Sequence, residues 1–195
     1  MTKVKSSDSI DASVQELVRK ARIAQKNYES FTQEKVDAIV RDIGKFVYDN
    51  AESLARMAVD ETEMGSYEDK ILKNHNKTLG LMRDLKDVIS FGHVCDDVVT
   101  GLSSYLRPKG IVAAIVPSTN PLATPVNNII NALKTGNAII LAPSPKGVKP
   151  LTTMLTDIHQ ALGRLGLPDN LVQMVPAPPS RAKTERLMKL SLIHI

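Results

Sequence analysis

Three short apolar runs, separated by segments with helical spacing, restrict the possible folds of this chain more than any other feature. The runs cover Ile111–Val116, residues 138–141 and residues 171–175. Each run is continuous rather than alternating, which is typical of strands buried in a parallel sheet. A strand, helix, strand, helix, strand order with short connections predicts a right-handed parallel α/β sheet.

The segments between these runs carry local signals for helices. The first helix is expected over residues 122–134 and should end at Gly136, because glycine readily adopts the left-handed conformation that closes a helix. Pro150 is expected to open the second helix, since proline is favoured at the first helical position. Gly166 is expected to end it. Both connections are therefore predicted to be helical crossovers.

The last residues of the chain suggest that the sheet is incomplete. Ser180 is a suitable N-cap for another helix, which should run to about Lys189. Residues 191–195 alternate weakly and resemble the first residues of a fourth strand. A sheet that stops where its fourth strand begins indicates that the chain is the N-terminal piece of a larger protein.

The N-terminal half has helical rather than strand spacing, from Ser9 to about Ser90. Thr32 is a plausible start for the second helix of this half, and Asn50 separates it from the third. A further helix is expected from Tyr67 to near Val88. These helices need a partner surface for their apolar stripes, and the stripes are Ile10, Val14, Leu17, Val18 and Ala21, then Val36, Ile39, Val40, Ile43 and Val47, then Leu54, Ala55, Ala58 and Val59.

Composition argues against several classes of function. The net charge is +4, but Lys and Arg are spread over helix faces and aromatic residues make up only 4%, so no nucleic-acid partner is expected. No apolar run is long enough for a membrane span, and the basic N-terminus is followed by polar residues, unlike a secretory signal. The only cysteine, Cys95, allows no internal disulfide, which fits the cytoplasm. The four histidines show no metal-ligand spacing, so no metal site is expected.

The turn after the first apolar run has two interpretations. Pro117, Ser118, Thr119, Asn120 and Pro121 form a polar segment between two prolines, and a helix follows at once. Backbone N–H groups and polar side chains at this place bind a pyrophosphate or stabilise an oxyanion in some enzymes. The other interpretation is an ordinary N-cap before a helix. The GxGxxG fingerprint of dinucleotide-binding proteins is absent, so any nucleotide must be held differently.

Four blocks of sequence resemble the CoA-acylating branch of the aldehyde dehydrogenase superfamily. They are PKGIVAAIVPSTNP at 108–121, ALKTGNAII at 132–140, PSPK at 143–146, and EMGSYEDK at 63–70 with Lys73 and Asn74. The resemblance runs from about Val18 to Met188. It implies N-terminal helices over residues 1–106, a partial Rossmann-like sheet over residues 107–195, and a catalytic domain that is absent from this chain.

The resemblance also implies an activity. Family members oxidise a small aldehyde through a cysteine thiohemiacetal, pass a hydride to NAD or NADP, and transfer the acyl group to coenzyme A. The nucleophile is expected beyond position 195, so the fragment itself is expected to be inactive. Cys95 is not that nucleophile, because it lies before the first strand and the neighbouring Asp96 and Asp97 carboxylates would oppose formation of a thiolate. A homo-oligomer is expected for the full-length protein.

Individual residues match the family loop that lines the nicotinamide and the catalytic cysteine. These residues are Val116, Pro117, Ser118, Thr119 and Asn120. In the non-acylating branch the position of Thr119 carries the oxyanion-hole amide and an aromatic residue follows it. Asn120 stands in the place of that aromatic residue. Thr119 and Asn120 are therefore the candidates for the oxyanion side of the catalytic site.

A second loop resembles the part of the family site near the adenosine. It comprises Pro143, Ser144, Pro145 and Lys146. Non-acylating members usually have a Lys and a Glu here for the ribose hydroxyls, at the positions of Ala142 and Pro145. This difference favours the acylating branch, since coenzyme A and NAD both need room at this edge. Lys146 is a candidate phosphate ligand.

Other functions are compatible with the residues. The chain is either part of such an enzyme or a non-catalytic nucleotide-binding or interaction module. A third interpretation keeps the superfamily but changes the reaction to reduction of an acyl phosphate. Acetaldehyde, sulfoacetaldehyde and succinate semialdehyde all remain as substrates, because the missing part builds most of the aldehyde pocket.

Overall fold

The computed structural model describes residues 2–190, with side chains from residue 10 onward. The predicted fourth strand at 191–195 lies outside this range. The helices are α1 (Thr2–Tyr28), α2 (Gln33–Asp49), α3 (Ala51–Thr62), α4 (Tyr67–Leu85), α5 (Ala123–Lys134), α6 (Val148–Arg164) and α7 (Arg181–Lys189). The strands are β1 (Gly92–Asp97), β2 (Leu102–Leu106), β3 (Ile111–Val116), β4 (Ala138–Pro143) and β5 (Val172–Met174), with short 3₁₀ turns η1 (Pro145–Gly147) and η2 (Asp169–Leu171).

The centre of the fold is a parallel sheet with the strand order β3-β4-β5. The predicted parallel α/β arrangement is confirmed. Strand β4 is buried along its whole length, as its continuous apolar sequence predicts. The prediction that β3 is equally buried is wrong, because β4 is its only strand partner among the described residues and Ile115 is 59% exposed. Strand β3 is therefore an edge strand in this part of the chain.

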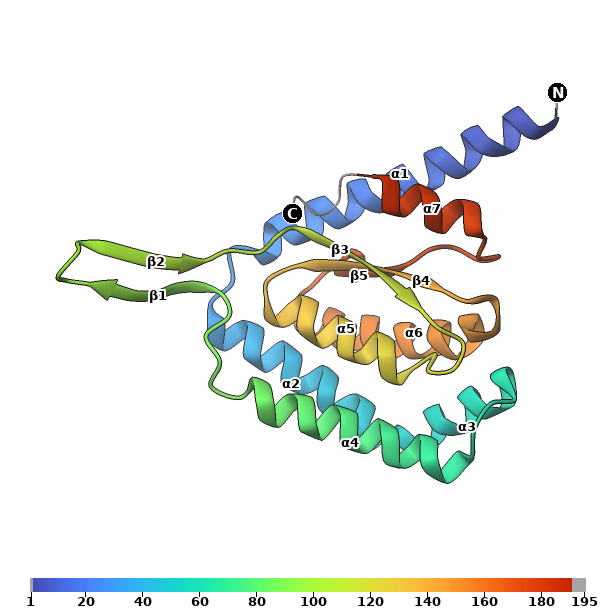
Figure 1. Ribbon diagram of the computed structural model, residues 1–195, viewed down its shortest axis with the longest axis horizontal. Helices are drawn as coiled ribbons and strands as arrows, with labels where there is room; N and C mark the ends of the chain where they lie inside the picture. Colours follow the sequence, from blue (N-terminus) through green and yellow to red (C-terminus); the bar gives the residue numbers. More distant parts are fainter. Residues whose placement is uncertain (1, 191–195) are drawn as a thin grey trace.

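Helices cover both faces of the sheet in layers (Figure 1). Helices α1 and α7 lie on one face, and α5 and α6 lie on the other. Helices α2, α3 and α4 pack against α5 and α6 and form a further layer. The apolar stripes predicted for the N-terminal helices are buried in these interfaces, which supplies the partner surface that such helices need. Among the described residues, no helix is long and apolar enough to cross a membrane.

Local capping signals set several helix boundaries. The Thr32 hydroxyl accepts a hydrogen bond from the backbone N–H of Lys35 at 3.4 Å and caps α2, as predicted. The Ser180 hydroxyl accepts from the N–H of Lys183 at 3.2 Å and caps α7, also as predicted. The predicted start of α6 is wrong, because η1 leads directly into a helix that begins at Val148. Pro150 lies within the first turn, where backbone N–H groups have no acceptor within the helix, so the N–H that proline lacks is not needed.

A hairpin in the N-terminal half was not predicted from its spacing. Strands β1 and β2 pair antiparallel, and Figure 1 shows them extending away from the helical layers. The Asp97 carboxylate accepts hydrogen bonds from the N–H groups of Val99 and Thr100, at 2.9 and 3.3 Å, and holds the turn. Gly101 follows with a φ of +69°. Because nearly all hairpin residues are exposed, they lack the apolar alternation that marks a half-buried strand.

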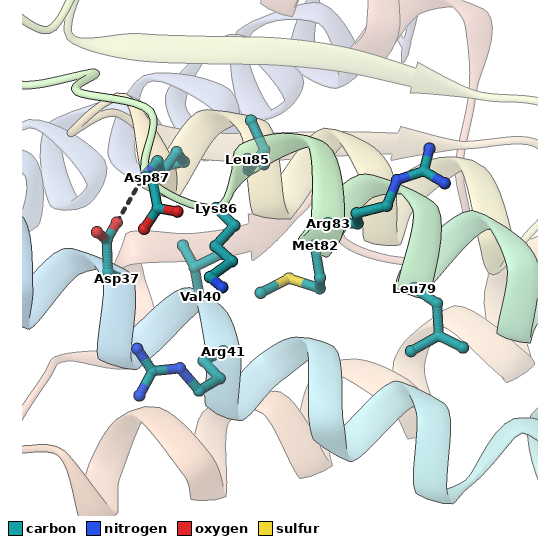
Figure 2. A pocket seen from close by; sticks show the side chains of 10 residues that line it. Asp37, Val40, Arg41, Leu79, Met82, Arg83, Leu85, Lys86 and Asp87 are labelled. Atoms are coloured by element: carbon teal, nitrogen blue, oxygen red, sulfur yellow. Dashed lines mark hydrogen bonds and ion pairs between the residues drawn. The ribbon is translucent and has the colours of Figure 1, made fainter.

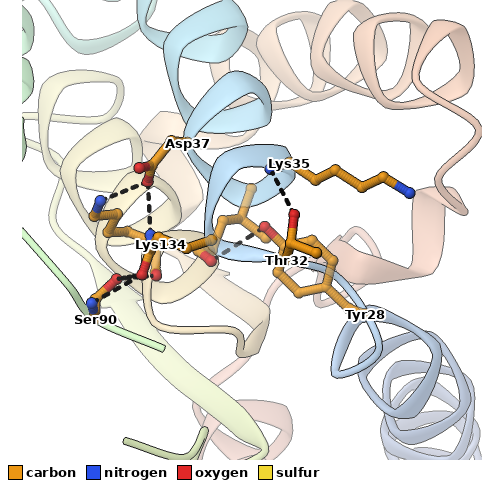
Figure 3. A network of polar contacts seen from close by, with 8 residues as sticks. Tyr28, Thr32, Lys35, Asp37, Ser90 and Lys134 are labelled. Atoms are coloured by element: carbon orange, nitrogen blue, oxygen red, sulfur yellow. Dashed lines mark hydrogen bonds and ion pairs between the residues drawn. The ribbon is translucent and has the colours of Figure 1, made fainter. Parts of the chain in front are cut away.

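A buried polar network joins α1, α2, α5 and the segment after α4 (Figure 3). The Lys134 ammonium lies 2.5 Å from the Asp37 carboxylate, and only 3% of the Lys134 side chain is exposed. The Lys134 carbonyl accepts from the Ser90 hydroxyl at 2.6 Å. The Tyr28 hydroxyl donates to the Leu133 carbonyl at 3.1 Å, and burial together with the Asp37 charge raises the Tyr28 pKa. The network fixes the C-terminal end of α5, and thus the orientation of the helix that follows the candidate loop.

Candidate functional site

The two loops singled out from the sequence lie side by side at the carboxyl edge of the sheet. Val116 and Pro143 are register partners at the ends of β3 and β4. The Ser144 N–H donates to the Val116 carbonyl at 3.0 Å. A Cβ atom on Gly147 would lie 3.0 Å from the Cβ of Pro121, so the absence of a side chain there lets the loops approach. In open α/β sheets, ligands bind beyond this edge.

The first loop, residues 117–121, presents a mixture of exposed and half-buried polar groups. Pro117 and Thr119 are exposed, whereas Ser118 and Asn120 are half-buried. None of these side chains caps the following helix, because the N-cap of α5 is Leu122 and it makes no side-chain hydrogen bond. The interpretation of this turn as an ordinary side-chain N-cap is therefore wrong. The polar groups and the positive end of α5 share one edge, which suits an anion or a developing oxyanion.

Two lysines of α4 hold the first loop from the side. The Lys70 ammonium donates to the Thr119 carbonyl at 3.2 Å, and the Lys73 ammonium donates to Asn120 Oδ1 at 3.0 Å. Lys70 is buried, and this burial, together with the charge of Lys73, lowers its pKa. The i, i+3 spacing puts both lysines on one face of the helix. The candidate oxyanion residues are thus fixed by two cations.

The sequence alone does not indicate a role for these lysines. They lie in the block that resembles the family, but 49 and 47 positions separate them from their loop partners. Helix α4 is positioned by Ser66, whose hydroxyl accepts from the Asp69 N–H at 3.1 Å, and by Asn74, whose buried amide donates to the Ala51 carbonyl at 3.2 Å. The Lys-x-x-Lys spacing was the available signal, but it does not reveal which loop the lysines contact.

The second loop carries a polar atom that lacks a partner. The Ser144 hydroxyl oxygen is buried and makes no hydrogen bond to any residue that the structure describes. Pro145 and Lys146 are exposed beside it, and Gly147 is buried against the first loop. An unpaired buried hydroxyl is unfavourable unless a ligand or water satisfies it. This loop therefore has the chemistry of a ligand-binding segment.

A groove also lies outside the candidate site. It has a volume of about 580 Å³ and runs between α2 and α4 (Figure 2). Leu79, Met82 and Lys86 line one side, and Val40 and Arg41 line the other. It is at the opposite end of α4 from Lys70 and Lys73, so it does not form part of the candidate site.

Potential catalytic groups of other kinds are not assembled near the loops. Cys95 is exposed on the projecting hairpin. Within residues 10–190, no group of His, Cys, Asp and Glu side chains has the arrangement of a metal site.

A layered parallel sheet with two polar loops at its carboxyl edge is the arrangement of Rossmann-like nucleotide-binding domains. Among proteins with such a domain, the chain matches one family: the profile described as "Aldehyde dehydrogenase family" aligns with residues 2–191. The chain belongs to the aldehyde dehydrogenase family.

Relatives come from the acylating branch. A sulfoacetaldehyde dehydrogenase (acylating) of Cupriavidus necator is 47% identical over 175 residues, which are 89% of this chain and 36% of that protein. A succinate-semialdehyde dehydrogenase (acetylating) of Clostridium kluyveri is 43% identical over 181 residues, covering 93% of this chain and 40% of that protein. The chain thus spans about two fifths or less of the length of these relatives.

Solved structures show the same fold. An acetylating aldehyde dehydrogenase from Geobacillus thermoglucosidasius superposes with a TM-score of 0.89 at 34% identity, over 96% of this chain and 41% of that one. A Rhodopseudomonas palustris propionaldehyde dehydrogenase with bound propionyl-CoA gives a TM-score of 0.77 at 31% identity, over 92% of this chain and 39% of that one. These similarities support the fold over nearly the whole described range.

Proposed function

We propose that the whole protein containing this chain is a CoA-acylating aldehyde dehydrogenase. It oxidises a small aldehyde to an acyl-CoA, with NAD or NADP as hydride acceptor and coenzyme A as acyl acceptor. The observation that carries this proposal is the pair of loops at the carboxyl edge of the sheet, held together by the Ser144 to Val116 hydrogen bond. The names of the acylating relatives support the choice of branch.

The first loop has the groups needed on the aldehyde side. In this proposal Val116, Pro117 and Ser118 line the nicotinamide, and Thr119 and Asn120 stabilise the oxygen of the reacting carbonyl. Preorganised donors of this kind contribute most when they cannot reorient during reaction. The contacts of Lys70 and Lys73 supply that rigidity. The cofactor, when bound, accepts the hydride.

The second loop has features that fit a dinucleotide. Ser144 offers a buried hydroxyl that lacks a partner among the described residues, and Gly147 leaves room for close approach of the two loops. In this proposal Pro143, Ser144 and Pro145 lie against the adenosine, and the exposed Lys146 binds a phosphate. The absence of Lys and Glu at positions 142 and 145 leaves the edge open for coenzyme A as well.

The nucleophile is proposed to lie in the portion of the relatives that this chain does not span. Cys95 is the only cysteine in the sequence, and its place on the projecting hairpin separates it from the sheet edge (Figure 1). Residues 1–195 expressed alone are therefore expected to give no turnover with any aldehyde.

We also propose that the whole protein is a cytoplasmic homo-oligomer. The hairpin supports self-association, because Val98 and Val99 at its tip are 92% and 91% exposed. Leu102 and Tyr105 on β2 are also exposed. Exposed apolar groups gathered in this way are typical of an interface, and a second copy of the same chain would cover them.

The test is NADH formation by the whole protein with an aldehyde and coenzyme A. Turnover that requires coenzyme A supports the proposal. Turnover that instead requires phosphate would identify an acyl-phosphate reaction and would contradict it. A whole protein that binds nucleotide but oxidises no aldehyde would favour a non-catalytic binding module.

A further inference from the structure

Two lysine ammonium groups converge on the candidate oxyanion loop without a carboxylate to balance them. Lys70 and Lys73 each use one donor on this loop, at 3.2 Å to the Thr119 carbonyl and 3.0 Å to Asn120 Oδ1. Within residues 10–190, neither ammonium lies within ion-pair distance of an Asp or Glu carboxylate. The buried Lys134 differs, since it has Asp37 as its partner.

An uncompensated pair of cations is unfavourable in a partly buried place. The charge of Lys73 and the burial of Lys70 both oppose the charged form of Lys70, and its pKa is lowered accordingly. The positive end of α5, which begins at Ala123, adds to the same field. A negative group bound beside the lysines would relieve this repulsion.

The lysines still have hydrogen-bonding capacity for a ligand. An ammonium has three donors, and the structure gives each lysine one partner on the loop. Lys73 is exposed, so its free donors are accessible. The hollow that both lysines line with Asn120 and Pro121 is only about 10 Å³, so a ligand must approach Lys73 from its exposed side. Because the Lys73 ammonium lies 3.0 Å from Asn120 Oδ1, a ligand whose reacting end lies at Thr119 and Asn120 reaches it with a group a few bonds away.

We propose that Lys73, supported by Lys70, binds an anionic group on the aldehyde substrate. The substrate class is then an aldehyde that carries a carboxylate or sulfonate a few bonds from its carbonyl. This inference rests on the proposed function of the whole protein. Lys73 acts as a specificity residue, and Lys70 positions the loop through the Thr119 carbonyl.

The experiment compares matched aldehydes on the whole protein with its coenzymes. Succinate semialdehyde and butanal have the same number of carbons but differ in charge, and sulfoacetaldehyde tests the sulfonate. We expect wild-type kcat/KM to be higher for the anionic aldehydes. Lys73→Met should lower kcat/KM for them by about tenfold or more, because hydrogen bonds between charged groups are the strong ones. Butanal should lose less, by about threefold, because for this substrate Lys73→Met removes only the contact that holds Asn120 and no contact with a charged group.

Two further variants separate charge from general damage to the helix. Lys73→Arg keeps the charge and should retain most of the preference for anionic aldehydes. Lys77→Met removes an exposed lysine one turn further along α4 and should leave both aldehydes unaffected. Lys73 is exposed, so folding is not expected to depend on it.

Several outcomes would overturn the inference. One is an equal loss on charged and neutral aldehydes in Lys73→Met, which would indicate loop positioning alone. Another is a rise in KM for NAD or coenzyme A without a change for the aldehyde, which would assign the lysine to a cofactor phosphate. A wild-type enzyme that is active but prefers butanal also refutes it and leaves the proposed function intact. A wild type that is inactive on every aldehyde refutes the proposed function and this inference together.

Discussion

Removing the Asp37 carboxylate should destabilise the fold more than removing its partner Lys134. The Lys134 side chain is only 3% exposed, whereas that of Asp37 is 31% exposed. Asp37→Ala would leave an ammonium buried without its counter-ion. Breaking a buried pair in this way costs about 3–5 kcal/mol. Since water reaches Asp37, we expect the lower part of that range, about 3 kcal/mol.

Lys134→Met should cost less, because the remaining carboxylate can be hydrated and still accepts a hydrogen bond from Gln33 at 2.8 Å. The double variant Lys134→Met with Asp37→Ala should recover part of the loss of Asp37→Ala, since it removes the stranded charge. The free energy of unfolding from urea denaturation measures these differences, and an unchanged m-value would show that the same surface unfolds.

If Asp37→Ala is no more destabilising than Lys134→Met, the cost does not come from a stranded buried ammonium. The same conclusion follows if the double variant is less stable than Asp37→Ala. The exposed pair Lys45 and Asp49, at 2.7 Å, serves as the control, because exposed ion pairs contribute little. Asp49→Ala should leave the urea midpoint nearly unchanged.

Four other substitutions test local features. Gly136→Ala should lower the free energy of unfolding by about 2 kcal/mol or more, because the residue has a φ of +74° and a Cβ would lie 2.9 Å from the Phe91 ring. Gly163→Ala is the control: a Cβ on this residue of α6 would meet no atom within 4 Å, so the substitution should raise the melting temperature. Gly147→Ala should push the two loops apart and weaken NAD binding by the whole protein, with only a small fall in the melting temperature. The same NAD affinity in variant and wild type would contradict a role for the loop contact in NAD binding. Ser180→Ala should cost about 1 kcal/mol in urea unfolding, through loss of a cap.

The sheet and its connecting helices could be predicted from the sequence because their signals are local. The continuous apolar run of β4 reflects burial on both faces, and Gly136 marks the end of α5 with a positive φ. Thr32 and Ser180 mark helix starts in the same way. Each of these features depends on residues a few positions apart. For that reason the predicted order of strands and helices after Gly110 agrees with the structure.

The features that could not be predicted depend on residues distant in sequence or on exposure. The hairpin of β1 and β2 packs little against the body, so no apolar pattern reveals it. The exposure of Ile115 follows from the position of β3 at the edge, which a run of apolar residues does not show. The contacts of Lys70 and Lys73 with the candidate loop depend on how α4 packs. The proximity of the two loops themselves followed from topology alone.

The placement of α1 has a consequence for how the chain is made. The Tyr28 hydroxyl bonds to the Leu133 carbonyl, and the Gln173 amide donates to the Leu17 carbonyl across 156 positions. Helix α1 leaves the ribosome before these partners, which follow it at separations of 105 and 156 positions. Its apolar stripe must therefore stay exposed while the intervening residues are synthesised, when association with other chains competes with folding. Docking of α1 completes the fold only after nearly all of the described chain has emerged.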